Sequence, residues 1–271
     1  MIRQSLDALA RFSPQFRRLM MRTWYEALVV IDREKQITFM NYGYAEPEGT
    51  GKTLVLPATD EANRYAIQMY HHVASAIDLT GKDVVEIGSG RGGGAAYVAA
   101  TFNPKSVLGI DISKKAVDFC NRYYSTDRLS FKQGDAENIP LANNSVDVVI
   151  NIESSHCYGS MERFVHQVSR ILRPDGYFLF ADHRDDQKLP TLRKQFQDGS
   201  LEIVSETDMT SNVVRALDLD NDRRKELIHD ACSPALRRQV EEFAAVVGTR
   251  TYESFNEGAS RYVSFRLQKR V

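Results

Sequence analysis

A dense glycine loop between an apolar run and a helical stretch constrains the fold of this chain more than any other feature. The apolar run at 83–87 leads into Gly88, Gly90 and Gly92, and a helical pattern follows at 95–100. A loop with few side chains lets a ligand lie against the backbone at the carboxyl end of a strand. The loop therefore predicts a strand–loop–helix unit that binds a ligand.

From residue 83 onward, short apolar runs alternate with helical patterns. This alternation is typical of βαβ units that build a parallel sheet. We expect an α/β fold with a Rossmann-like, seven-stranded, mostly parallel sheet, helices on both faces and one more helix at 62–77. The predicted strands are 83–87, 106–111, 129–133, 146–150, 176–181, 201–205 and 261–267.

Helical patterns also stand outside the predicted sheet, at both ends of the chain. Residues 1–35 carry apolar positions at helical spacing with arginines between them, and Ser13-Pro14 separates two short helices. We expect a helical extension at 1–35, a candidate lid or subunit contact of a homo-oligomer, and a main domain at 36–271. A helical cap is expected at 207–255, with one helix that starts at Ser233-Pro234 and ends at Gly248.

Charge and composition exclude several classes of partner. Lys and Arg number 35 against 36 Asp and Glu, so no global positive field collects nucleic acid. The three cysteines form no CxxC pair, which is typical of a reducing compartment. No apolar run reaches the roughly 18 residues of a membrane span, and no secretion signal opens the sequence. We therefore expect a cytoplasmic protein without a nucleic-acid partner or a stable membrane span.

Acidic residues stand at or just after the ends of three successive predicted strands. Glu86, entering the glycine loop, repels a dinucleotide pyrophosphate but suits the ammonium and sulfonium charges of S-adenosylmethionine. Asp111 ends the next strand, where a carboxylate accepts hydrogen bonds from both ribose hydroxyls. Asp135 and the Ala136 N–H follow the third strand and suit an adenine ring. The three positions together favour S-adenosylmethionine over a nicotinamide cofactor.

These residues resemble those of the class I S-adenosylmethionine-dependent methyltransferases, whose acidic-x-Gly-x-Gly-x-Gly loop matches Glu86, Gly88, Gly90 and Gly92. Segments 134–140, 144–149 and 172–177 are similar to later motifs of that family. The chain looks most like the phthiotriol dimycocerosate O-methyltransferases and, more distantly, the sterol C-methyltransferases. The resemblance implies a small-molecule or lipid-like substrate, and a cofactor contact from Tyr44 within 39–44, a segment similar to one that folds over the cofactor's methionine end.

The cofactor contacts that we expect are Tyr44, Glu86, Gly88, Ser89, Gly90, Gly92, Asp111, Ile112, Asp135, Ala136 and Asn151.

Methyl transfer is an in-line displacement at an activated sulfonium, so it needs alignment and no metal. An alcohol acceptor also needs a base for its proton. The fourth strand opens into 151–158, which brings Glu153 and His156 to the carboxyl end of the sheet. We predict His156 as the base, with Glu153 beside it and His183 in reserve. A divalent metal on Asp182, Asp185 and Asp186 is considered, but we expect none.

Three other functions remain open. If the acceptor is an alkene carbon of an isoprenoid, methylation creates a carbocation, which Glu153, Tyr158 and aromatic faces would shield. Gly88, Gly90 and Gly93 also satisfy GxGxxG, so an NAD-dependent dehydrogenase or a noncatalytic cofactor-binding module is an alternative. Binding of S-adenosylhomocysteine without turnover would indicate the noncatalytic module, and binding of NADH would indicate the dehydrogenase.

Overall fold

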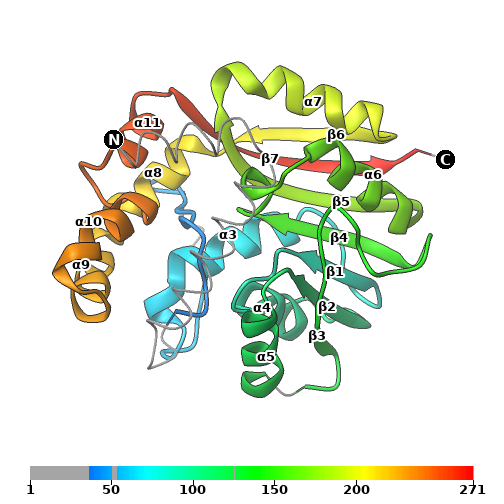
Figure 1. Ribbon diagram of the computed structural model, residues 1–271, viewed down its shortest axis with the longest axis horizontal. Helices are drawn as coiled ribbons and strands as arrows, with labels where there is room; N and C mark the ends of the chain where they lie inside the picture. The colour runs from blue at the N-terminus through cyan, green and yellow to red at the C-terminus, as the bar shows by residue number, and fades with distance from the viewer. Residues whose placement is uncertain (1–36, 51–53, 125, 271) are drawn as a thin grey trace.

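A seven-stranded mixed sheet forms the centre of the protein in the computed structural model, which describes residues 37–50, 54–124 and 126–270 (Figure 1). The order of the strands is β3-β2-β1-β4-β5-β7-β6, and β7 runs antiparallel to both its neighbours while the other pairs are parallel. The predicted seven-stranded, mostly parallel sheet is confirmed. The predicted helices at 1–35 lie outside the described residues.

The strands are β1 (Asp83–Ile87), β2 (Ser106–Asp111), β3 (Leu129–Gln133), β4 (Val146–Ile152), β5 (Leu172–Asp185), β6 (Leu201–Asp208) and β7 (Ser260–Lys269). The helices are α3 (Arg64–Ala74), α4 (Gly93–Thr101), α5 (Lys114–Tyr123), α6 (Met161–Ile171), α7 (Leu189–Asp198), α8 (Thr210–Leu219), α9 (Asn221–Ala231), α10 (Pro234–Phe243) and α11 (Arg250–Asn256).

Helices cover both faces of the sheet because successive strand residues point to opposite sides. On β1, Val84 packs in one buried cluster with side chains of α3, α4 and α5. The next residue, Val85, packs in the other cluster with side chains of α6 and α7. Burial on both faces explains why the central strands read as continuous apolar runs.

Several predicted boundaries are wrong, each for a local reason. The helix expected at 62–77 begins with a short 3-10 turn at Glu61–Asn63, and α3 already ends at Ala74, where the Ala76 N–H bonds to the Val73 carbonyl three residues back. Strand β5 starts before residue 176 because Leu172 pairs with Val146. It also ends later, at Asp185, because its ladder with β7 continues to that residue.

The helices α8 to α11 occupy the region where a cap was predicted. The boundary at 207 is wrong, because Thr207 and Asp208 still pair with β7 as part of β6. Helix α10 starts at Pro234 as expected, but Gly248 does not end it. The helix stops at Phe243 because Ala245 turns left-handed with φ +51°, and Gly248 lies in the loop beyond. In the described part of the chain, no helix has the length and apolar character needed to span a membrane.

Candidate active site

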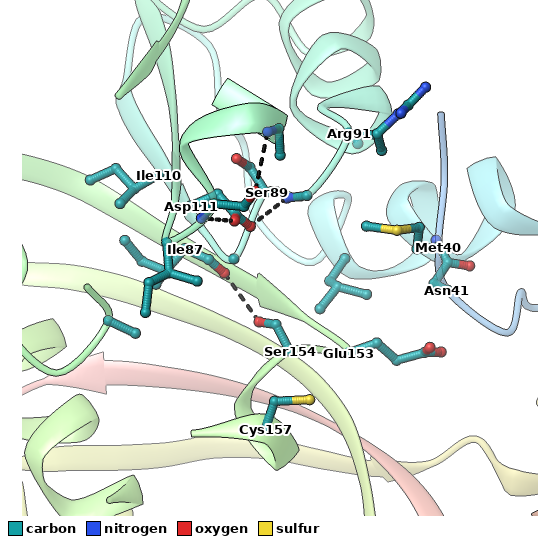
Figure 2. A pocket seen from close by; sticks show the side chains of 18 of the residues that line it. Met40, Asn41, Ile87, Ser89, Arg91, Ile110, Asp111, Glu153, Ser154 and Cys157 are labelled. Carbon is teal, nitrogen blue, oxygen red and sulfur yellow. Dashed lines mark hydrogen bonds between the residues drawn. The ribbon is translucent and has the colours of Figure 1, made fainter. Parts of the chain in front are cut away.

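A first cavity opens at the carboxyl ends of the central strands, beside the junction of β1 and β4 (Figure 2). Chain connections leave this junction toward opposite edges of the sheet, and ligands of open α/β sheets bind at such a point. The empty space, with its open mouth, is about 1170 Å³. The predicted cofactor contacts that line it are Gly88, Ser89, Gly90, Asp111, Ile112, Asp135 and Ala136.

The glycine loop lines the first cavity with two bare glycines beside Ser89 and Arg91. Gly88 and Gly90 have φ angles of +77° and +52°, which glycine adopts at little cost. A Cβ on Gly90 would lie 2.5 Å from Cε of Met40. Gly92 also has a positive φ, but it caps α4 and packs against Phe131 instead of lining the cavity. Its expected cofactor contact therefore stays a prediction.

Two carboxylates at strand ends are oriented by backbone N–H groups (Figure 2). The Gly90 and Ser113 N–H groups donate to Asp111 over 2.9 and 2.8 Å, and the Glu137 N–H donates to Asp135 over 2.9 Å. Burial raises the pKa of Asp111, and the two backbone donors oppose that rise. Because these bonds hold each carboxylate in place, the remaining oxygen lone pairs can accept hydrogen bonds from ligand hydroxyl or amino groups.

Glu86 lies behind the wall of the first cavity and does not line it. The Tyr70 hydroxyl, whose residue does line the cavity, donates to Oε1 of Glu86 over 2.6 Å. Burial raises the pKa of Glu86 to about 7, and the Tyr70 hydrogen bond opposes the rise. Glu86 therefore orients Tyr70, and a direct cofactor contact of its carboxylate stays a prediction.

Two other predicted contacts point elsewhere. Tyr44 stacks on His72 with ring centroids 4.4 Å apart and does not line the cavity, where residues 38–41 of the same segment do. The Asn151 amide donates to the carbonyl of Ile87 over 2.8 Å and is fully buried. Asn151 thus fixes the start of the glycine loop relative to β4.

Glu153 lines the first cavity from the end of β4 (Figure 2). Its φ of +45° is left-handed, a conformation that non-glycine residues rarely adopt and that turns the chain sharply at this point. The Tyr42 N–H donates to Oε1 of Glu153 over 2.7 Å. Burial raises the pKa of Glu153 to about 7, and the Tyr42 N–H opposes the rise. The side chain is therefore a carboxyl group that can change protonation near neutral pH.

His156 forms a dyad with Asp182 next to the first cavity. Its Nδ1 lies 2.8 Å from Oδ1 of Asp182, and its backbone N–H donates to Oδ2 over 2.9 Å. Burial would raise the pKa of Asp182, but the charges of His156 and Arg184 outweigh it and hold that pKa well below its usual range. For His156, burial is in turn outweighed by Cys157 and Asp182, which raise its pKa well above the usual range.

His183 packs against this dyad, with its ring centroid 4.4 Å from that of His156. Burial and the neighbouring His156 charge lower the pKa of His183 to about 3, so the ring stays neutral. Neither histidine lines the first cavity, whereas Glu153 and Cys157, which flank His156 in sequence, do. The structure thus brings the three predicted catalytic residues into one cluster at the ends of β4 and β5.

The cluster also contains side chains of the kinds that bind metal ions. One ligand atom from each of His156, Asp182 and His183 lies within 4.8 Å of the others. Arg184, however, places a cation 3.2 Å from Asp182, whose oxygens also accept from the Ser155 hydroxyl. The Asp185 and Asp186 carboxylates pair with Lys188 and Arg261 instead. We assign no metal to the cluster, because the donors already present occupy its carboxylate.

A second cavity adjoins the first under the helices α9 and α10. Phe39, Met40, Asn41 and Arg91 line both cavities. The empty space of the second cavity, with its open mouth, is about 930 Å³. The two cavities therefore place two ligand volumes side by side, with the 39–41 segment between them.

Comparisons with known proteins decide the family. Residues 85–180 match the model of the methyltransferase domain. The chain is 36% identical over 231 residues to a fatty-acid O-methyltransferase of Mycolicibacterium smegmatis, covering 85% of this chain and 82% of the relative. It is 34% identical over 265 residues to a phthiotriol/phenolphthiotriol dimycocerosates methyltransferase of Mycobacterium tuberculosis, covering 98% and 97%. The chain belongs to the S-adenosylmethionine-dependent methyltransferases.

A solved cyclopropane synthase of Mycobacterium tuberculosis shares the fold, with a TM-score of 0.69, 16% identity and coverage of 89% of this chain and 95% of that chain.

The first cavity of the methyltransferase suits S-adenosylmethionine. A Cβ on Gly88 would collide with Ser154 and Tyr158, so the loop needs glycine here to pack against the segment that follows β4. The oriented carboxylate of Asp111 suits a ribose, and that of Asp135 suits an adenine amino group. The residues present are thus chemically compatible with the cofactor of the family.

Sequence patterns missed several residues that line the methyltransferase's first cavity. Tyr70 comes from α3, and Arg91 from the glycine loop, where its guanidinium lies 3.8 Å over the Phe119 ring. Ser154 and Tyr158 form a hydrogen-bonded pair 2.9 Å apart. The sequence suggested Tyr158 only as a shield for a carbocation, and for Ser154 the only signal was its position after the fourth strand. Nothing in the local pattern around Tyr70 distinguishes it from an ordinary buried aromatic.

Proposed function

We propose that this methyltransferase transfers a methyl group to a hydroxyl oxygen of a small or lipid-like acceptor, with His156 as the general base. The observation that carries the proposal is the His156–Asp182 dyad, whose Nδ1 and Oδ1 atoms lie 2.8 Å apart. The dyad lies beside the first cavity, which is called the cofactor cavity from here on. Once it has lost its proton, a histidine held at one nitrogen by a buried carboxylate can take a proton at its other nitrogen. In His156 that nitrogen is Nε2, and the side chain also has a hydrogen bond with the neighbouring Cys157.

The residues of the dyad have separate roles in this proposal. Asp182 keeps the proton of Nδ1 in place and fixes the plane of the imidazole ring. Bound S-adenosylmethionine supplies a methyl group already activated on a sulfonium. As the acceptor oxygen gains the methyl group, its own proton moves to Nε2 of His156. Neutral His183 packs on the ring and adds no positive charge beside the histidine that must accept the proton.

The class of acceptor is supported by the relatives. One is named for fatty acids and the other for phthiotriol dimycocerosates, and both names describe lipids. The apolar wall of the second cavity, with Leu227, Val240 and Phe243, agrees with an acceptor that has a large apolar part. We therefore propose a lipid-like acceptor that reaches the methyl group from the second cavity.

Methylation of an alkene carbon is the second candidate. It is favoured by Glu153, a carboxyl group that lines the cofactor cavity, and by the ring of Tyr158 in the same wall. Both groups would stabilise a carbocation until a proton leaves. The bond formed by the transferred methyl group separates the two candidates.

The test is product analysis with methyl-¹³C-labelled S-adenosylmethionine and a panel of a long-chain alcohol, a fatty acid and an isoprenoid alkene. An O–CH3 signal in the extracted lipid is expected. His156→Ala is expected to lower kcat at least about tenfold, because general-base catalysis contributes on the order of 10²–10⁴-fold, while the affinity for S-adenosylhomocysteine stays unchanged. A C–CH3 product, or full activity of His156→Ala, would refute the proposal.

A further inference from the structure

The second cavity has an unusual charge for an apolar site. Its charged lining residues are Arg91, Arg223 and Arg224, and no Asp or Glu lines it within the part of the chain that the structure describes. The remaining wall is mainly apolar, with side chains such as Leu227 and Phe243. The whole chain, by contrast, has a formal net charge of −1. Positive charge is thus concentrated at this cavity.

Arg224 has a structural task that accounts for its position. It donates to Asp220 over 3.0 Å, to the carbonyl of Ala244 over 3.0 Å and to the carbonyl of Tyr42 over 2.9 Å. These bonds join the 37–45 segment to α9 and to the end of α10. Its side chain is only 11% exposed, so Arg224 acts as a buried link between elements.

Arg223 differs from its neighbour. Its Nε and Nη2 donate to the two oxygens of Asp220, both over 2.6 Å, and its side chain is 39% exposed. Among the described residues, no acceptor bonds to its Nη1. Asp220 carries one negative charge against the two positive charges of Arg223 and Arg224. Within this group of Asp220, Arg223 and Arg224, one positive charge therefore remains.

We propose that the second cavity binds an acceptor with an elongated apolar body and an anionic group, and that Arg223 pairs with that anionic group. The proposal rests on the proposed methyl transfer and names the chemistry of its substrate. A bound anion would neutralise the remaining charge through Nη1, in a partly desolvated site where charge-assisted hydrogen bonds are strong. A neutral alcohol would leave that charge uncompensated, and a cationic ligand would be repelled by it.

The shared wall connects this binding site to the reaction. Because Met40 and Asn41 line both cavities, a ligand in the second cavity reaches the segment that borders the cofactor. The apolar body would pack on Leu227, Val240 and Phe243 while Arg223 fixes one end. Arg223 is therefore a specificity residue, at a distance from the proton-accepting His156.

The experiment measures binding of decanoate, decyl phosphate, decanol and decyltrimethylammonium to the full chain saturated with S-adenosylhomocysteine, by titration calorimetry. We expect at least one of the two anions to bind about tenfold or more tightly than decanol, and the cation to bind most weakly. Which anion binds more tightly identifies the head group as a carboxylate or a phosphate. Arg223→Gln is expected to remove most of the preference for the anion, and Arg223→Lys, which keeps the charge, to retain part of it.

Arg193→Gln is the matched control, because Arg193 is also 39% exposed and pairs with a carboxylate, Glu206, outside both cavities. It is expected to bind all four probes like the wild type. Equal binding of the anions and decanol, or an unchanged preference in Arg223→Gln, would overturn the proposal. These titrations need no turnover, so they fail or succeed independently of the search for an O–CH3 product.

Discussion

Replacing Asp111 by alanine should weaken cofactor binding. The Asp111 carboxylate lines the cofactor cavity and is oriented by the Gly90 and Ser113 N–H groups at 2.9 and 2.8 Å. Its loss removes charge-assisted bonds to the ribose, about 1.5–3 kcal/mol. Since 1.4 kcal/mol is a factor of ten in affinity, the dissociation constant of S-adenosylhomocysteine should rise roughly 10- to 100-fold.

Calorimetric titration with S-adenosylhomocysteine measures this effect, and Asp147→Ala supplies the control. Asp147 also accepts a backbone hydrogen bond, from the Asp83 N–H over 2.8 Å, but it does not line the cofactor cavity. Both variants lose a carboxylate that binds a backbone donor, and Asp147 also pairs with Arg173 over 2.7 Å, but only Asp111 lines the cofactor cavity. An Asp111→Ala protein that unfolds at the same temperature as Asp147→Ala and binds S-adenosylhomocysteine like the wild type would refute the assignment.

Two further predictions concern protonation. The negative charge of Asp182 helps to raise the pKa of His156, so kcat/KM should increase with pH as His156 loses its proton. Asp182→Asn should move that increase to lower pH. A pH profile that is the same in Asp182→Asn and the wild type would contradict the role of the dyad. Burial raises the pKa of Glu153 from 4.5 to about 7, so the folded state binds this proton more tightly and loses stability as the pH rises between these values. Glu153→Gln should remove this loss. In urea unfolding without cofactor, the free energy of unfolding of the variant relative to the wild type should increase by on the order of 1–3 kcal/mol between pH 5 and pH 8. An identical pH dependence of stability in both proteins would contradict the prediction.

The sequence predicted the parts of the fold that depend on local patterns. Strands β1, β2 and β3 have the predicted bounds, because β1 and β2 are short, mainly apolar runs and β3 alternates buried and exposed residues before Gly134. The ends of β5 and β6 were missed because pairing with β7 sets them, and β7 lies far along the chain. The helix end at Phe243 was missed because Ala245, and not a glycine, adopts the left-handed conformation.

The site residues, too, were predicted where they depend on local patterns and were missed where they depend on packing. Gly88, Gly90, Asp111 and Asp135 line the cofactor cavity because each lies at, or within three residues after, the carboxyl end of a strand that the pattern identified. Glu86 was expected in the cavity for its charge, but a residue inside a strand points to one face of the sheet, and the face of Glu86 carries Tyr70. Strand periodicity does not reveal which helix covers that face.

The second cavity shows why the acceptor is harder to predict than the cofactor. Its walls come from the 37–42 segment, α3, the glycine loop, α9 and α10, and the hydrogen bond from Arg224 to the Tyr42 carbonyl joins residues 182 positions apart. In sequence, Arg223 and Arg224 are two charged residues of a polar helix, typical of a solvated surface. They become part of a binding wall only when α9 packs over the 37–42 segment. The charge of the second cavity, our proposed acceptor site, is therefore a property of the packed helices. Substitution of Arg223 tests the proposal without changing the glycine loop.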